Sequence, residues 1–85
     1  MFKVQKKDGS LEDFDRNKII NGIVKSGGTP EQAENIAGQI EAWAAGAAVN
    51  GVIKTLDIRS KLLELLGEVN PAAKANFESY RKPAV

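Results

Sequence analysis

The chain has 85 residues, of which 42% are apolar; 12 basic and 11 acidic side chains leave a net charge of +1. These values are typical of one small folded domain and exclude both a disordered tail and a membrane protein. The absence of cysteine and histidine excludes disulfide frameworks, zinc ribbons, thiol nucleophiles and imidazole bases. Because the sequence also has no long apolar run and no apolar signal region, we expect a soluble, cytoplasmic protein.

The N-terminal segment, residues 2–14, predicts a β-hairpin that turns at Gly9. A two-residue loop would place Lys3 opposite Phe14 and leave neither face of the hairpin apolar. A three-residue loop over residues 7–9, with Gly9 left-handed, instead pairs Val4 with Glu12. One face then carries Phe2, Val4, Lys6, Glu12 and Phe14. Because this face combines apolar, cationic and acidic groups, we interpret it as a pocket wall rather than part of a dry core.

Two helices are expected next. Asp15 is a suitable N-cap for a first helix over residues 16–26. Thr29 and Gln32 form a capping box that opens a second helix, with Pro30 at its first position. Small residues follow in this helix around a single large ring, that of Trp43, which we expect to anchor the core.

The last third of the chain predicts a short third strand and two more helices. Residues 52–54 are compatible with the strand, and Thr55 is the expected cap of a third helix over residues 56–66, which Gly67 interrupts. A fourth helix begins after Asn70 and ends near Lys82. The expected fold class is therefore α+β and mostly α, with an N-terminal hairpin capping a four-helix cluster.

Basic residues gather at the ends of these elements. Lys6 and Lys7 lie at the hairpin tip, Arg16 and Lys18 in the first turn of helix one, and Lys54 before helix three. Cations in a first turn oppose the helix macrodipole at a cost of about 0.3–1 kcal/mol each, and a bound phosphate would remove that conflict. Each residue also has a structural explanation, since turn lysines keep a hairpin soluble and a carboxylate on a strand can pair with a lysine.

Taken together, several segments resemble the ATP-cone family. The opening motif is VQKKDG at residues 4–9, followed by Glu12, Phe-Asp at residues 14–15 and Lys-Ile at residues 18–19. One position departs, because Lys7 stands where the family pattern has arginine. Residues 52–58 resemble the family's second signature, and residues 77–82 resemble its aromatic and basic end. The resemblance extends from about Phe2 to Lys82.

This resemblance implies an allosteric domain that binds ATP or dATP, leaves Mg²⁺ open as an accompanying ion, and performs no catalysis. Such domains regulate ribonucleotide reductases or belong to repressors of reductase genes. The resemblance places adenine near Val4 and Ile19, with Glu12 recognising its amino group. It gives the phosphates to Lys6, Lys18 and Thr55, assisted by Lys7 and one of Arg81 or Lys82. Asp15 belongs to the same motif, and Arg59, one turn after Thr55, is a candidate for contacting the ribose 2′-position.

We expect one ATP-cone-like domain over residues 1–85, with residues 83–85 as a short tail. Its expected partners are ATP or dATP and either a reductase, a regulator or a second copy, without a membrane or nucleic acid. The alternative function is a nucleotide-independent interaction module that docks through Ala44, Gly46 and Ala47 of helix two. A nucleic-acid-binding module is a further alternative, which is disfavoured because residues 26–53 carry three acids and no bases.

Overall fold

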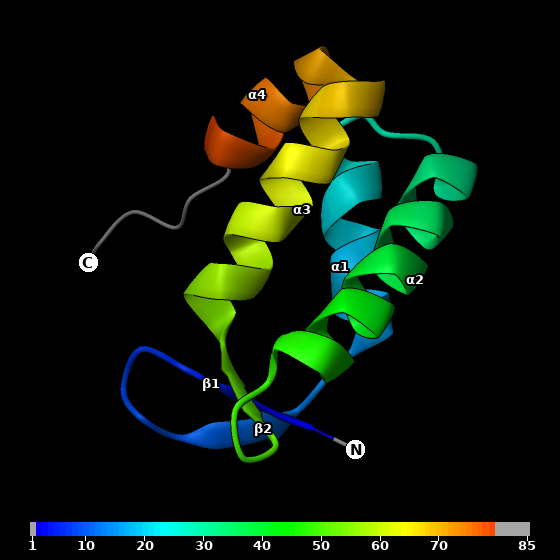
Figure 1. Cartoon of the computed structure of the whole chain (residues 1–85). Helices are drawn as coiled ribbons and strands as arrows, with labels where there is room; N and C mark the ends of the chain where they lie inside the picture. Colours follow the sequence, from blue (N-terminus) through cyan, green and yellow to red (C-terminus); the bar gives the residue numbers. More distant parts are fainter. Residues whose placement is uncertain (1, 80–85) are drawn as a thin grey trace.

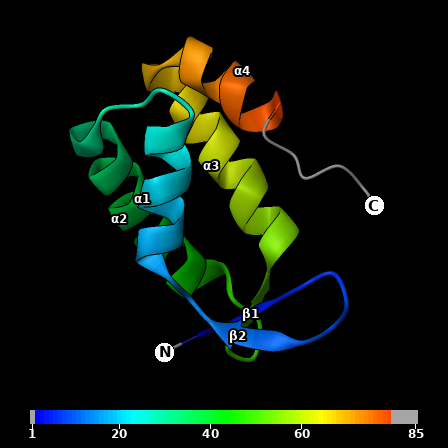
Figure 2. The ribbon, with the colours of Figure 1, turned by 180° about the vertical axis from the view of Figure 1, so that it is seen from behind.

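The computed structural model describes residues 2–79, and these form a small sheet at one end of four helices (Figure 1). The elements are β1 (Lys3–Gln5), β2 (Leu11–Asp13), α1 (Arg16–Lys25), α2 (Pro30–Ala47), β3 (Val52–Lys54), α3 (Thr55–Val69) and α4 (Pro71–Ser79). Helix α2 packs against both α1 and α3, and α4 packs against the far end of α3 (Figures 1 and 2). The predicted fold class, a mostly helical α+β domain with an N-terminal hairpin, is confirmed.

The three strands form one sheet in the order β2-β1-β3. Strand β1 pairs antiparallel with β2, and Val4 lies opposite Glu12, as the three-residue loop predicts. Gly9 has a φ of 89°, and its N–H donates to the carbonyl of Lys6 at 2.9 Å. Both the hairpin register and the left-handed glycine are therefore confirmed. The short third strand is confirmed as well, and it pairs parallel with β1 so that Val4 lies opposite Ile53.

The mixed face of the hairpin does not form a pocket wall along its whole length, which corrects our interpretation. Phe2 and Val4 are only 7% and 6% exposed and belong to the core. The rings of Phe2 and Phe14 pack with their centroids 5.1 Å apart. Because the sheet closes one end of the helices, Phe2 and Val4 are covered, Glu12 and Phe14 are half-buried, and Lys6 is exposed.

The first two helices begin as predicted. The Asp15 carboxylate accepts a hydrogen bond from the Asn17 N–H at 2.9 Å, and α1 ends at Lys25 with Ser26 as its C-cap. At the start of α2, Thr29 and Gln32 exchange both hydrogen bonds of the capping box. These caps satisfy N–H groups that have no partner inside the helix.

Helix α3 differs from the prediction at both ends. Thr55 is its first residue rather than its cap, and Lys54 occupies the N-cap position without a side-chain hydrogen bond. At the other end α3 continues through Gly67 to Val69. A Cβ atom at Gly67 would lie 2.9 Å from the Cδ of Lys74, so this glycine lets α4 approach α3 closely instead of ending the helix. Helix α4 is described to Ser79, and its predicted end at Lys82 lies outside the described residues.

The core receives apolar side chains from the sheet and from all four helices. Its members are Phe2, Val4, Ile23, Ala33, Ile36, Ile40, Ala44, Ile53, Ile58, Leu62, Leu66 and Ala73. Trp43 is half-buried against the edge of this cluster rather than central to it, and the Lys61 ammonium lies 5.8 Å from its ring centroid. Within residues 2–79, no helix is long and apolar enough to cross a membrane.

The small residues of α2 do not form the single docking face of the alternative function. Ala44 is fully buried in the core, whereas Gly46 and Ala47 are exposed. Gly46, two residues after Ala44, lies on another side of the helix. Ala47 is exposed although it is three residues after Ala44, and it is the last residue of α2. An interface built on all three residues is therefore excluded.

Replacing a large core side chain by alanine should destabilise the domain. Leu66 is fully buried, so we expect Leu66→Ala to lower the free energy of unfolding by about 2–5 kcal/mol, measured by urea denaturation. Val69→Ala is the matched control on the same helix, because Val69 is 53% exposed, and it should change stability by less than about 0.5 kcal/mol. Equal effects of the two substitutions would contradict this description of the core.

Two glycines should respond in opposite directions to substitution by alanine. A Cβ at Gly46, near the end of α2, would meet no atom within 4 Å, so Gly46→Ala should stabilise the domain by about 0.5 kcal/mol. A Cβ at the buried Gly28 would lie 2.5 Å from the Cγ2 of Ile23, so Gly28→Ala should destabilise it. Thermal unfolding of the two variants checks the sign of each change, and a gain from Gly28→Ala would show that the turn can relax.

Candidate functional site

A cleft of about 410 Å³ lies between the hairpin loop and the helices α1, α3 and α4. Its walls are formed by Lys7, Lys18, Ile19, Thr55, Leu56, Ile58, Arg59, Leu62 and Phe77. A smaller hollow of about 310 Å³ adjoins it and is lined by Gln5, Lys6, Lys7, Gly9, Lys54, Thr55 and Leu56. Because Lys7, Thr55 and Leu56 line both, the two spaces meet where the hairpin loop faces the start of α3.

All charged side chains of the described residues that line the cleft and the smaller hollow are positive. Lys7 comes from the hairpin loop, Lys18 from α1 and Arg59 from α3. Among the described residues, no acidic side chain lines either space. The buried side chains of Ile58 and Leu62 supply an apolar floor. A concave site with an apolar floor and convergent cations suits a ligand that has both a flat apolar part and an anionic part.

Glu12 links two of the predicted phosphate ligands. One of its carboxylate oxygens, Oε2, lies 3.4 Å from the Nζ of Lys6 and 3.6 Å from the Nζ of Lys18. All three side chains are at least one-third exposed, so these ion pairs add little to stability. They place two ammonium groups, one beside the hairpin loop and one in the first turn of α1, next to one carboxylate.

The start of α3 differs from the starts of the other described helices. Side chains of Asp15 and Thr29 cap α1 and α2, and the Asn70 Oδ1 accepts from the Ala73 N–H at 3.0 Å at the start of α4. No side chain caps α3, where Lys54 is the N-cap. Thr55, directly after it, lines both the cleft and the smaller hollow. Uncapped N–H groups beside a threonine hydroxyl are suited to donate hydrogen bonds to a phosphate oxygen.

Asp8 fixes the shape of the hairpin loop. Its Oδ1 accepts hydrogen bonds from the N–H of Ser10 at 2.9 Å and from the hydroxyl of Ser10 at 2.6 Å. These two bonds to Ser10 lower the pKa of Asp8 below its ordinary value. The ionised carboxylate thus closes the loop whose residues Lys6 and Lys7 line the smaller hollow.

The structure brings together six of the predicted site residues. Lys6, Lys7, Lys18, Ile19, Thr55 and Arg59 line one or both spaces. Glu12 lies beside them through its two lysine contacts. Val4 and Asp15 line neither space, because Val4 is in the core and Asp15 caps α1. Lys82 and Arg81 lie outside the described residues.

Sequence reasoning missed two residues that line the cleft, Leu56 and Phe77. Leu56 was not predicted as a site residue, and it is 51% exposed. Its position could have indicated this, because it is an apolar residue directly after the expected cap, Thr55, and it lies off the core-facing stripe of the helix. Phe77, expected at the core or its edge, also forms part of the cleft wall. Arg16 lies near Gly38 of α2 and does not line the cleft. Lys6 and Lys7, both expected at the hairpin tip, line the smaller hollow together.

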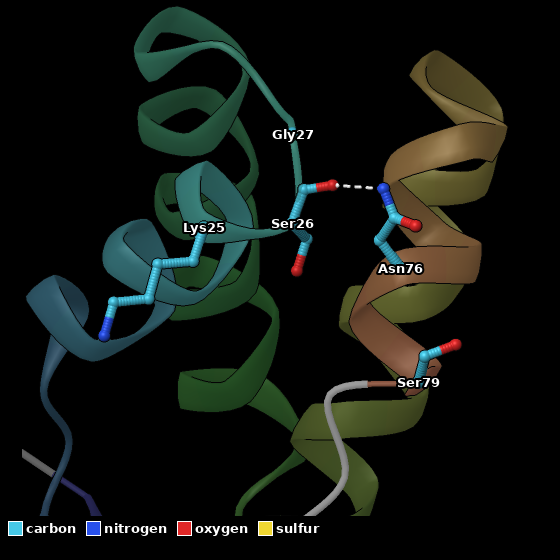
Figure 3. Close-up of a pocket in the computed structure, with 5 residues that line it drawn as sticks. All are labelled: Lys25, Ser26, Gly27, Asn76 and Ser79. Atoms are coloured by element: carbon cyan, nitrogen blue, oxygen red, sulfur yellow. Dashed lines mark hydrogen bonds between the residues drawn. The ribbon is translucent and has the colours of Figure 1, made fainter.

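A third hollow, of about 430 Å³, lies between the end of α1 and α4 (Figure 3). It is lined by Lys25, Ser26, Gly27, Asn76 and Ser79. The Asn76 amide donates to the Ser26 carbonyl at 2.9 Å, and the Lys25 side chain points away from this pair. With one cation and no apolar side chain in its lining, this hollow is a poorer candidate than the cleft.

Comparison with known proteins identifies relatives over nearly the whole chain. The model of the ATP cone domain family matches residues 2–83. A transcriptional repressor NrdR from Clostridium acetobutylicum is 37% identical in an alignment 84 residues long, which covers 93% of this chain and 55% of that protein. A transcriptional repressor NrdR from Staphylococcus aureus strain N315 is 32% identical over 83 residues, covering 93% of this chain and 53% of that protein.

The chain thus spans about half the length of the curated relatives it matches. Their shared name, transcriptional repressor, gives no support to the expectation that nucleic acid is absent among the partners. The family match, in contrast, agrees with the motif at residues 4–19 and with a cationic cleft next to it. The chain belongs to the ATP cone domain family, a family of regulatory nucleotide-binding domains.

Proposed function

We propose that this domain binds ATP or dATP in the cleft and the adjoining hollow, as a regulatory ligand rather than a substrate. The observation that carries the proposal is the convergence of Lys7, Lys18 and Arg59, from three separate elements, on one cleft with an apolar floor. Cations on separate elements can surround a triphosphate, which a single basic helix cannot do. The family match supports the same ligand class.

The phosphates are assigned to the junction of the two spaces. Lys6 and Lys7 line the smaller hollow, Lys7 and Lys18 line the cleft, and Thr55 at the uncapped start of α3 lines both spaces. Lys82 is proposed as an additional cation. Within residues 2–79, no group of three or more acidic side chains is placed to hold a metal ion. Mg²⁺, where it accompanies the nucleotide, would therefore be bound mainly by the phosphates.

The base is assigned to the side of the cleft formed by α1. Ile19 provides an apolar surface there, and Val4 supports the hairpin from within the core. Glu12 is proposed to accept a hydrogen bond from the adenine amino group. Because Glu12 also pairs with Lys6 and Lys18, a nucleotide that draws these lysines to its phosphates frees the carboxylate for the base. Asp15 contributes indirectly by capping α1, which carries Lys18 and Ile19.

Regulation would arise from the hairpin loop. In this structure Glu12 pairs with Lys6, next to the loop, and with Lys18 of α1. Bound phosphates would instead draw the lysines of the loop toward the start of α3. The two arrangements offer different surfaces to a partner protein, and such differential contacts are what couples a ligand to a distant event. We propose that bound ATP is not hydrolysed.

The regulated process is proposed from the relatives. Both are transcriptional repressors, which favours control of gene expression over direct contact with a ribonucleotide reductase. We propose that residues 1–85 act as the nucleotide-sensing domain in such a system, in a cytoplasmic setting. Occupancy by ATP or dATP would then report the cellular nucleotide supply to the partner, whether that is another domain, another protein or a second copy.

Removal of one phosphate-binding lysine should reduce ATP affinity without unfolding the domain. Lys6→Ala and Lys18→Ala are each expected to weaken binding about 10- to 100-fold in calorimetric titrations, since a hydrogen bond to a charged group contributes about 1.5–3 kcal/mol. Lys25→Ala is the matched control, because it removes the same charge two turns along α1 and away from the cleft. Unchanged affinity in both Lys6→Ala and Lys18→Ala would refute the site.

Glu12 should determine the choice of base. We expect Glu12→Ala to reduce the preference for ATP over GTP at least about fivefold, because adenine offers an amino donor to the carboxylate where guanine has a carbonyl. Asp13→Ala is the control, since it removes a carboxylate from the same strand that pairs with Lys3 instead. If parallel titrations with ATP and GTP give the same ratio in Glu12→Ala as in the unmodified domain, the base is recognised elsewhere.

A further inference from the structure

Arg59 and Phe77 form a contact inside the cleft that joins α3 to α4. The Arg59 guanidinium carbon lies 5.2 Å from the centroid of the Phe77 ring. We infer that Phe77 is a positioning residue that presents Arg59 to the phosphates, which makes α4 part of the nucleotide site. This inference rests on the proposed function and assigns to Arg59 a role in binding phosphate rather than the ribose.

The geometry leaves the hydrogen-bonding edge of Arg59 available. A guanidinium above an aromatic ring uses its face for the cation–π contact, whereas its five N–H donors lie in its own plane. Among residues 2–79, no carboxylate lies within ion-pairing distance of Arg59. Its donors are therefore uncommitted in the described part of the chain, although the side chain is half-buried and its cation is oriented by the ring.

The ring is a rigid support for this cation. A Cβ atom at Gly22 of α1 would lie 3.1 Å from the Cε2 of Phe77, so the ring is already in close contact with the α1 backbone. The next residue back in α4, Asn76, donates to the Ser26 carbonyl at 2.9 Å. Helix α4 thus contacts α1 at the Phe77 ring and again at Asn76, and these two contacts restrain the position of the ring.

Arg59 supplies a geometry that the lysines lack. It is the one guanidinium among the described residues that line the cleft, and it lies one turn after Thr55 at the uncapped start of α3. A guanidinium binds two phosphate oxygens in a planar fork, whereas an ammonium acts as a point charge. The guanidinium binds two phosphate oxygens well in only one orientation. Its contact with the Phe77 ring restricts that orientation before binding and so lowers the conformational entropy lost on binding.

The test is a double-mutant cycle measured by calorimetric titration with ATP and, separately, with inorganic tripolyphosphate. We expect Arg59→Ala to weaken both ligands about 10- to 100-fold. Phe77→Leu, which removes the ring face, should weaken them about three- to fivefold. Phe77→Leu should have no further effect in the Arg59→Ala background, and Phe77→Tyr, which keeps the ring, should stay within about twofold of the unmodified domain. Thermal unfolding of each variant identifies those that no longer fold.

Each result bears on one of the two proposals. If Phe77→Leu weakens binding equally with and without Arg59, the ring acts through packing alone, and the inference is overturned. It is overturned too if ATP affinity depends on Lys18 but not on Arg59, although the proposed function then survives. Binding of tripolyphosphate that depends on Arg59, without any binding of ATP, supports the inference and refutes the proposed function. Failure of the unmodified domain to bind either ligand overturns both.

A second measurement separates positioning from simple structural support. If ligand phosphates are bound by an arginine that rests on Phe77, ATP should slow amide hydrogen exchange across α4. The slowing should disappear in Arg59→Ala at concentrations of ATP that saturate this variant. Protection that persists in saturated Arg59→Ala would show that α4 responds to the nucleotide by another route.

Discussion

The parallel pairing of β1 with β3 is the constraint on which the site depends. Gln5, the last residue of β1, lies opposite Lys54, the last residue of β3, and both strands run in the same direction. The hairpin loop and the first residue of α3 therefore leave the sheet at the same edge. Because no residue separates β3 from α3, the register of this pair determines how close Lys6 and Lys7 lie to Thr55. A shift of one residue would move every side chain of β1 to the other face.

Features of the fold that depend on local chemistry could be predicted from the sequence. The left-handed Gly9, the Asp15 cap and the Thr29 capping box are each specified within a few residues, and the structure contains all three. Features that depend on contacts between distant segments could not be predicted from the sequence. Gly67 has the local character of a helix end, but α3 continues through it, and the space beside Gly67 is taken by Lys74 of α4.

The site shows the same division. The motif at residues 4–19 and the family resemblance identified six residues that line the two spaces, although each has a structural explanation by itself. The functional explanation is favoured because these six residues lie together around the two spaces. Their closeness depends on the pairing of β1 with β3. Arg16 and Lys18 illustrate this point, because both are cations in the first turn of α1. One side chain lies near Gly38 and the other pairs with Glu12 beside the cleft.

The small size of the domain makes a bound nucleotide energetically important. A domain of 85 residues has a free energy of unfolding near the lower end of the usual range of about 5–15 kcal/mol. A ligand at 100 times its dissociation constant adds about 2.7 kcal/mol, a large fraction of that total. The contacts that supply this free energy would form in part at the hairpin loop, residues 6–10, all of which are exposed. Occupancy would therefore change the order of the loop more than that of the core, as a sensor that must report through its surface requires.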